Sequence, residues 1–229
     1  MGPAMGLWSG PSAGTGVIRA RVSGPGNPAE GSGRESSWRG SRWGGAASVE
    51  CVLIAPLVVL ITAAIFEFGL ACRDARTLSN ALRSGARVGS NAGRERQADY
   101  TILKSVEAAM TEFPTAQVQR VIVYKASTSN SDVPAACLAI TGSGGVTGSC
   151  NVYQSSDLAR PLSDFGGTTS CSGTSPDRYW CPTTRNVSFG GSDFIGVYMK
   201  VDHRWLTRIF GTNKSIQDQS VIRMEPRSR

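Results

Sequence analysis

Residues 44–72 read GGAASVECVLIAPLVVLITAAIFEFGLAC, and this stretch organises the rest of the chain. After Ala46 it is interrupted by only two charges, Glu50 and Glu67, and the 16 residues between them carry none. At about 1.5 Å per helical residue, residues 46–72 are long enough to cross the hydrocarbon core of a bilayer. The pattern therefore predicts a transmembrane helix over residues 46–72.

The order of features around this helix differs from that of a secretory signal peptide. A signal peptide places small residues and its cleavage site after the apolar run, whereas here Gly44 and Gly45 precede it. A cut between Gly45 and Ala46 would make Glu50 the fifth residue of the mature chain, about one turn from the new amine of Ala46. An acid in a membrane helix is costly, so we interpret Glu50 as functional, pairing with that amine in its own chain or a neighbour.

This arrangement resembles type IV prepilins, and a longer pattern narrows the resemblance to the TadE-like minor pilins and pseudopilins of the tight-adherence (Flp, type IVc) pilus system. Its motifs are Ala47-x-Val49-Glu50-x-x-Leu53-x-x-Pro56, Glu67-Phe68-Gly69 and Leu78-x-x-Ala81-x-Arg83-x-Gly85-Ala86-Arg87-x-Gly89. The resemblance covers residues 44–90, with a weaker similarity at residues 220–225. Cys51 departs from the pattern, because the family usually has a large apolar residue there.

The resemblance implies a structural protein, not an enzyme, with no cofactor. A prepilin peptidase would cut after Gly45, and the helix from Ala46 would assemble with other pilins and pseudopilins. The expected location is the cytoplasmic membrane, single-pass, with an extracytoplasmic C-terminal domain that can enter surface pili. Two alternatives stay open: an unprocessed single-pass envelope protein with a disulfide-bonded binding domain, and a pilus-tip adhesin that binds through its loops.

Residues 1–45 differ in composition from the rest of the chain. They hold 12 Gly, 4 Pro and 7 Ser, which predicts a disordered leader that is removed on maturation. This segment is longer than the usual prepilin leader. Either the protein has a real long leader, or the assigned start of the chain lies upstream of the true start. The net charge of the whole chain is +7, and removing five arginines and two glutamates with the leader leaves +4. A charge so small and dispersed argues against a nucleic-acid partner.

Two residues inside the helix need their own interpretation. Pro56 cannot donate a backbone hydrogen bond, so a kink is expected near residues 52–56. Glu67 lies between Phe66 and Phe68 and is interpreted as a solvated acid at the outer membrane interface, with a subunit contact as the alternative. Beyond Glu67, small and apolar residues recur on one narrow helix face, which predicts that the helix continues and packs closely against another element. These residues are Ala71, Ala75, Leu78, Leu82, Gly85 and Gly89.

Two features of the sequence give conflicting predictions for the orientation of the chain in the membrane. The arginines after the helix, which are Arg73, Arg76, Arg83 and Arg87, outnumber Arg39 and Arg42 before it and favour a cytoplasmic C-terminus. Four cysteines in a loop-rich region indicate disulfides and an oxidising compartment, and we give them more weight. Of the three pairings, the local ones are favoured, namely Cys137 with Cys150 and Cys171 with Cys181. No metal site is expected, because the chain has no CxxC pair and only one histidine, His203, interpreted as a satisfied structural residue.

The remaining pattern predicts an α+β fold in which a small antiparallel sheet packs on the long helix. Residues 73–113 form an extracytoplasmic helical segment whose second helix covers residues 95–113, and residues 114–229 form a small domain. Strands are predicted at residues 118–125, 194–203 and 215–225, with a bend or helical turn at 205–210. Residues 126–192 are predicted to be disulfide-bonded loops with a short strand at 137–141, whose aromatic residues pack around the disulfides or are exposed to a partner.

Overall fold

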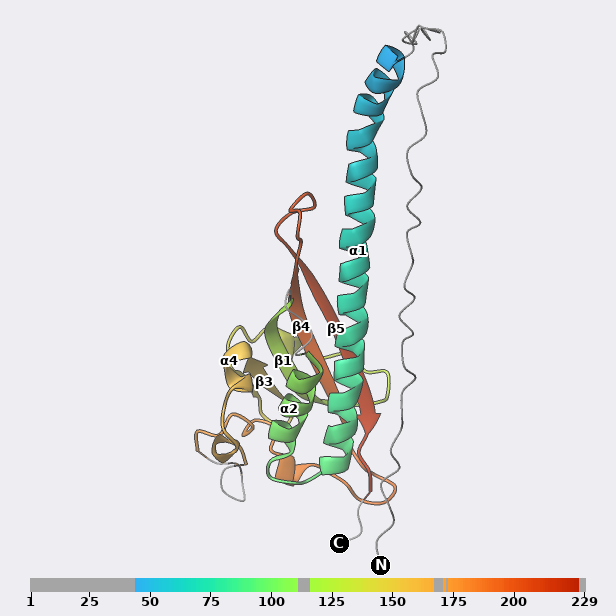
Figure 1. Cartoon of the computed structure of the whole chain (residues 1–229). Coiled ribbons are helices and arrows are strands. Elements are labelled where there is room, and N and C mark those ends of the chain that lie inside the picture. Colours follow the sequence, from blue (N-terminus) through green and yellow to red (C-terminus); the bar gives the residue numbers. More distant parts are fainter. Residues whose placement is uncertain (1–43, 111–115, 167–170, 172, 227–229) are drawn as a thin grey trace, which may run out of the picture. The chain divides into compact units, whose positions relative to one another are not determined.

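The computed structural model describes residues 44–110, 116–166, 171 and 173–226. Residues 46–229 form one compact unit. Apart from the first residues of its long helix, every described element belongs to this unit (Figure 1). The predicted leader, residues 1–45, lies outside the described residues except for Gly44 and Gly45.

The longest element is α1 (Gly44–Ala92), whose 49 residues extend over about 70 Å at 1.5 Å per residue. It runs without interruption through Pro56, and it ends where Gly93 adopts a left-handed backbone (φ 53°). The Gly93 amide donates to the carbonyl of Gly89 at 3.1 Å, which satisfies one of the last helical acceptors. The predicted continuation of the membrane helix is therefore confirmed, whereas a kink at Pro56 stays a prediction.

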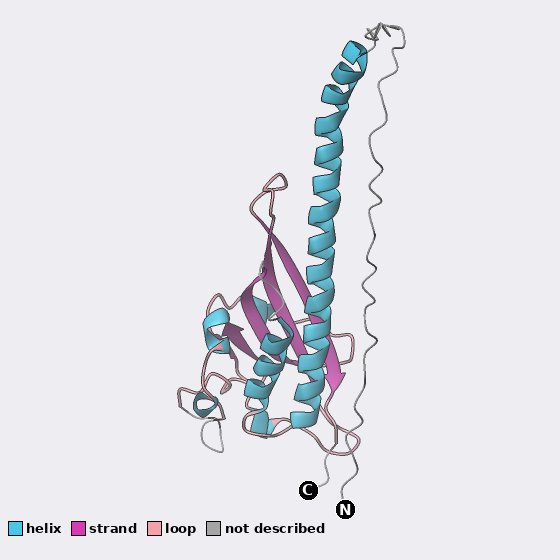
Figure 2. Ribbon diagram, in the orientation of Figure 1, coloured by secondary structure: helices cyan, strands magenta, loops and turns pink. Residues whose placement is uncertain are grey.

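A second helix and a sheet complete the domain. Helix α2 (Ala98–Met110) starts three residues later than predicted, and residues 111–113 of the prediction lie outside the described part. The sheet contains β1 (Ala116–Ala126), β2 (Gly144–Val146), β3 (Cys150–Gln154), β4 (Phe194–Arg204) and β5 (Asn213–Arg223). Its order is β2-β3-β1-β4-β5 and every pairing is antiparallel. Figure 2 shows the strands in magenta beside the long helix. The predicted α+β fold, with a small antiparallel sheet beside a long helix, is confirmed.

Each face of the sheet is covered by a different layer. Val121, Val197 and Met199 point to α1 and α2, where they join one core cluster with Leu78 and Ile102. The side chains on the opposite face of the sheet form a second cluster, which includes Ile122, Tyr124, Val152 and Tyr198. The loop after β1 covers this cluster with Val133 and with the disulfide between Cys137 and Cys150. Both faces of the strands are thus apolar because each has its own cover.

The predicted loop region holds more regular structure than the sequence suggested. The strand predicted at residues 137–141 is wrong, because Ala135–Leu138 forms the short helix α3 after Pro134. Strands β2 and β3 follow instead, and α4 (Ser155–Leu158), η1 (Leu162–Asp164) and η2 (Pro182–Thr184) complete the region. A glycine is required at Gly145, where a Cβ would stand 2.3 Å from the Cys150 carbonyl oxygen and 2.6 Å from Tyr179. Glycines make β2 hard to recognise from strand propensity.

The small residues of α1 let α2 and the sheet approach it closely, as the narrow face predicted. A Cβ at Gly85 would lie 2.6 Å from Cγ2 of Val106, and one at Gly89 would lie 2.8 Å from the Cδ1 atoms of Ile102 and Ile195. The arginines Arg73, Arg76, Arg83 and Arg87 are all exposed, away from this face. Close packing here joins the helix to the domain as one unit.

We predict that Gly85→Leu lowers the free energy of unfolding of the domain by about 1–3 kcal/mol, because the new side chain must displace Val106. Thermal unfolding of the full chain in detergent, followed by near-ultraviolet circular dichroism, measures the change. Gly69→Leu is the matched control, since a Cβ at Gly69 meets nothing within 4 Å. Equal losses from the two variants would contradict the proposed role of Gly85.

Candidate functional site

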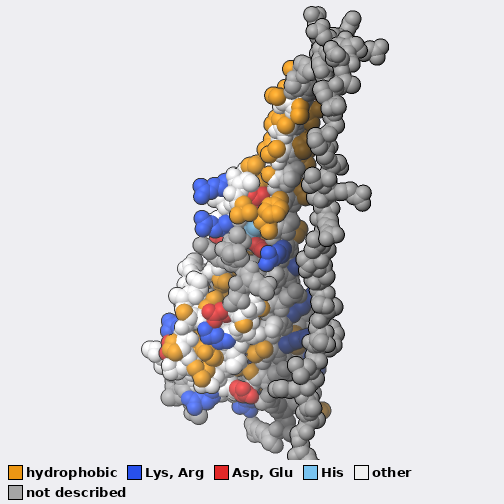
Figure 3. Space-filling model, viewed as in Figure 1, with side chains coloured by type: hydrophobic (Ala, Val, Ile, Leu, Met, Phe, Trp, Pro, Cys, Tyr) orange, Lys and Arg blue, Asp and Glu red, His pale blue; other side chains and the backbone are white. Residues whose placement is uncertain are grey.

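The N-terminal half of α1 exposes large apolar side chains, and we call its residues 49–66 the exposed rod. Large hydrophobic side chains from Val49 to Phe66 are at least half exposed, with Leu53 at 72% and Ile65 at 70%. Among the described residues this is the one helix long and apolar enough to cross a membrane, with a mean hydropathy of 2.6 in its best window. Figure 3 shows these side chains continuing along the upper helix. Such a surface is stable in lipid or against other helices, not in water.

The predicted processing and pairing residues lie at the start of this rod. Gly45 and Ala46 belong to the first turn of α1, and Glu50 follows one turn after Ala46 with its side chain exposed. Four helical residues correspond to an axial rise of about 6 Å, so an amine at Ala46 and the Glu50 carboxylate would occupy neighbouring turns. Cys51 and Cys72 are free thiols, both exposed.

Glu67 lies where the exposed rod meets the folded domain, and the interpretation of it as a solvated acid is wrong. Its side chain is completely buried. One carboxylate oxygen accepts a hydrogen bond from the backbone N–H of Leu206 at 3.1 Å, and the other accepts from the N–H of Thr207. Both donors belong to the loop between β4 and β5. The carboxylate therefore satisfies two backbone donors that the hairpin turn leaves unpaired.

Three aromatic rings close around this contact. Phe68 lies with its ring centroid 5.7 Å from that of Trp205 and 5.2 Å from that of Phe210, and Trp205 and Phe210 are 5.8 Å apart. Trp205 is only 7% exposed, whereas Phe68 and Phe210 remain about half exposed. The cluster excludes water from the Glu67 carboxylate and strengthens its hydrogen bonds.

A second polar contact lies two turns further along the same face of α1. Asp74 Oδ2 is 2.6 Å from Nδ1 of His203 on β4, both side chains are buried, and the His203 ring packs edge-on against Trp205 at 4.9 Å. The interpretation of His203 as a satisfied structural residue holds for Nδ1, while Nε2 has no hydrogen-bond partner among the described residues.

Polar contacts between α1 and the β4–β5 hairpin continue to the end of the helix. Ser79 Oγ donates to Asp218 on β5, and Ser90 Oγ donates to the carbonyl of Arg223 at 2.7 Å. Together with Glu67 and Asp74, these contacts attach α1 to the β4–β5 hairpin at four levels. Glu67 and Asp74 are seven residues apart, which places them on one helix face. That spacing is a sequence signal that the two acids share a face, although it does not identify the hairpin as their partner.

A buried charge network holds the second disulfide loop. The guanidinium of Arg185 pairs with Asp99 on α2, both fully buried, and lies 4.2 Å from the ring centroid of Trp180. Asp99 Oδ2 also accepts from Tyr153 Oη at 2.6 Å and from Asn151 Nδ2 at 2.8 Å. Burial, then the nearby Asp99 carboxylate, raises the pKa of the Tyr153 phenol well above its usual value, so that it remains a donor.

The cysteines pair locally, as Cys137–Cys150 and Cys171–Cys181. The predicted disulfide-bonded loops are confirmed, and three aromatic residues of this region pack inward. Tyr153, Phe165 and Trp180 are all at most 4% exposed. Tyr179 is partly exposed, and Phe189 is 90% exposed on the loop before β4.

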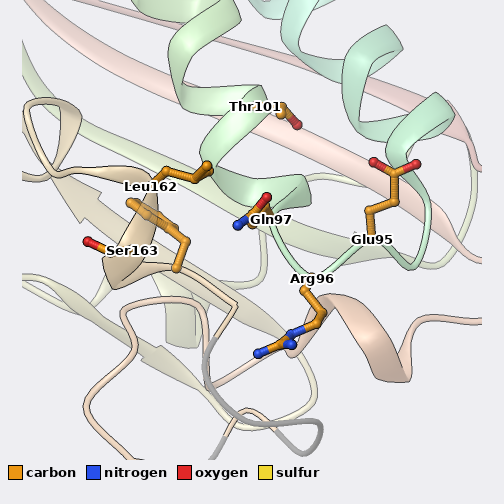
Figure 4. Close-up of a pocket in the computed structure, with 7 residues that line it drawn as sticks. Glu95, Arg96, Gln97, Thr101, Leu162 and Ser163 are labelled. Carbon is orange, nitrogen blue, oxygen red and sulfur yellow. The ribbon is translucent and has the colours of Figure 1, made fainter.

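A surface pocket beside the second helix does not bring reactive groups together. It measures about 530 Å³ and lies near the turn between α1 and α2, lined by Glu95, Arg96, Gln97, Thr101, Leu162, Ser163 and Phe165 (Figure 4). Arg96 is engaged, since its Nε donates to the carbonyl of Gly166 at 3.1 Å. Within the described part of the chain, no three His, Cys, Asp or Glu side chains gather as metal ligands.

The described unit is a protein with one membrane-capable helix that continues directly into a disulfide-bonded α+β domain. Residues 45–87 match the family model described as TadE-like protein, which confirms the resemblance over this segment. No curated protein and no solved structure matches the chain. The TadE-like segment supports involvement in a tight-adherence pilus system, whose TadE-like proteins are structural and not enzymatic.

We predict that Glu67→Ala speeds hydrogen exchange at the backbone amides of Leu206 and Thr207 by roughly tenfold or more, because both lose their charged acceptor. Hydrogen–deuterium exchange with mass spectrometry on the full chain in detergent measures this. Glu50→Ala is the matched control, an exposed acid on the same helix, and leaves exchange in the hairpin unchanged. Unaltered exchange in Glu67→Ala would show that the contact between α1 and the β4–β5 hairpin does not depend on the carboxylate.

Proposed function

We propose that this chain is a minor pilin or pseudopilin of a tight-adherence pilus, with the exposed half of α1 as its assembly element. The observation that carries the proposal is the continuity of α1, one half exposed and apolar, the other half built into a folded domain. The TadE-like match covers both halves, from Gly45 to Arg87. A helix of this kind can pass from lipid to a bundle of neighbouring helices without exposing its apolar surface to water.

A prepilin peptidase would cut the chain between Gly45 and Ala46, removing residues 1–45. The TadE-like segment begins at this glycine, which supports the assignment. The amine of Ala46 would then carry a positive charge one turn before Glu50. The mature chain would stay anchored through residues 46–72 in the cytoplasmic membrane, with the disulfide-bonded domain on the oxidising, extracytoplasmic side.

Glu50 would be buried when apolar helices pack together, and an unpaired charge there would oppose assembly. Its pairing with the Ala46 amine, in its own chain or the adjacent subunit, compensates for the lost hydration. An inter-subunit pair would also select the axial register, because a shift of one helical turn separates the two charges. Other pilins and pseudopilins are thus the partners of the exposed rod.

We predict that protein from native membranes or sheared surface fractions begins at Ala46, as shown by N-terminal sequencing and intact mass. Gly45→Leu should leave a precursor whose mass includes residues 1–45, because the residue before the cut is no longer small. A wild-type chain that retains residues 1–45 would instead indicate the unprocessed envelope protein. A cut near Cys72 would indicate a secreted domain, and either result ends the pilin assignment.

We predict that Glu50→Ala leaves membrane insertion intact and lowers incorporation into pili several-fold, since the paired charge that sets register is lost. Membrane fractionation and immunoblotting of sheared pili measure the two steps separately. Ser48→Ala, two residues earlier on α1, is the control and assembles normally. Normal incorporation of Glu50→Ala would reject the pairing mechanism while leaving the processing result untouched.

A further inference from the structure

The tip of the β4–β5 hairpin carries an unusual surface for a firmly held loop. Leu206 is 57% exposed, Ile209 is 52% exposed and Phe210 is 44% exposed, all within five residues. Single exposed hydrophobic residues are common on proteins, but three at one turn form a patch that calls for a partner.

The exposure does not come from a loose loop. The tip is held by the Glu67 carboxylate, by burial of Trp205 against Phe68, and by a hydrogen bond from the Trp205 amide to the Thr212 carbonyl at 3.2 Å. These contacts position the backbone, while Leu206 and Ile209 are more than half exposed and Phe210, at the edge of the aromatic cluster, keeps 44% of its surface exposed. The patch is therefore presented at a defined place.

That place is the boundary of the membrane-capable segment. Glu67 and Phe68 directly follow the exposed apolar residues 49–66, which would span about 27 Å at 1.5 Å per residue. The hairpin tip lies beside this point of α1 and is directed toward its apolar half (Figure 1). A bilayer around residues 49–66 would bring its headgroup layer level with the tip.

The charges at the tip match an anionic surface. Residues 204–214 contain Arg204, Arg208 and Lys214, all exposed, and no acidic residue. Arg208 occupies a left-handed backbone position (φ 58°) at the turn, between Leu206 and Ile209. Figure 3 shows Lys and Arg side chains flanking a hydrophobic patch beside the helix. Basic residues around apolar ones are typical of interfacial lipid contacts.

We propose that the β4–β5 hairpin tip is a second membrane contact, in which Leu206, Ile209 and Phe210 enter the interface of an anionic bilayer. Arg204, Arg208 and Lys214 bind the phosphate groups of its lipids. With α1 as the first attachment, the tip fixes the orientation of the domain relative to the membrane before the domain moves into a filament. The inference requires a membrane-spanning α1 but not the pilus role, so it holds equally for an unprocessed anchor.

The test uses the full chain with Cys51→Ser and Cys72→Ser, which leaves both disulfides intact, and Leu206→Cys labelled with an environment-sensitive fluorophore. The protein is placed in nanodiscs of phosphatidylcholine with phosphatidylglycerol. We expect blue-shifted emission at position 206 and quenching by lipids spin-labelled just below the headgroup. The matched control is Phe189→Cys in the same background, since Phe189 is 90% exposed on the loop before β4 and should not be quenched.

Charge dependence completes the test. Arg208→Glu, or discs of phosphatidylcholine alone, should reduce quenching at position 206 several-fold while the unfolding temperature of the domain is unchanged. Equal quenching at positions 206 and 189 would overturn the proposal. Blue-shifted emission without lipid quenching, increasing with two chains per disc, would also overturn it and assign the patch to a second copy.

Discussion

Two backbone N–H groups at a hairpin turn and one carboxylate on a helix join the two halves of this molecule. Glu67 is the last residue before α1 becomes part of the domain, and each of its two oxygens accepts a backbone hydrogen bond, from Leu206 and from Thr207. A carboxylate next to an apolar segment is costly unless its lone pairs are satisfied. The fold provides that satisfaction from a loop about 140 residues away in sequence, and so couples the membrane helix to the last two strands.

The same helix serves two environments because its surface changes along its length. Before Glu67 the large apolar side chains are exposed on all sides, whereas beyond it only one narrow face is apolar and the arginines face outward. Asp74, Ser79 and Ser90 repeat the polar contact to the β4–β5 hairpin at successive levels. These contacts connect the helix directly to the sheet, so a force on the exposed half of α1 would be transmitted to the β4–β5 hairpin.

The far side of the domain is stabilised differently. Strands β2 and β3 are short, and the segment after them has little regular structure, so the two disulfides and the buried Asp99–Arg185 pair replace a larger core. Asn151 and Tyr153 on β3 complete the hydrogen bonds of Asp99, which lets a charged pair remain inside the domain. Tyr153, Phe165 and Trp180 are buried in this packing, whereas three exposed apolar side chains gather at the hairpin tip, namely Leu206, Ile209 and Phe210.

Local sequence was sufficient for α1, α2 and strands β1, β4 and β5, because long periodic segments and a run of apolar residues carry their own signal. The TadE-like pattern over residues 45–87 is likewise readable because it is contiguous. Strands β2 and β3 escaped prediction. Glycines at positions 144 and 145 give β2 no strand propensity, and the glycine at 145 is required only by the close approach of Cys150 and Tyr179. The roles of Glu67, His203 and Asp99 depended wholly on tertiary structure. A carboxylate flanked by aromatics looks the same in sequence whether water or a distant backbone amide satisfies it, and only the folded chain brings that amide within reach.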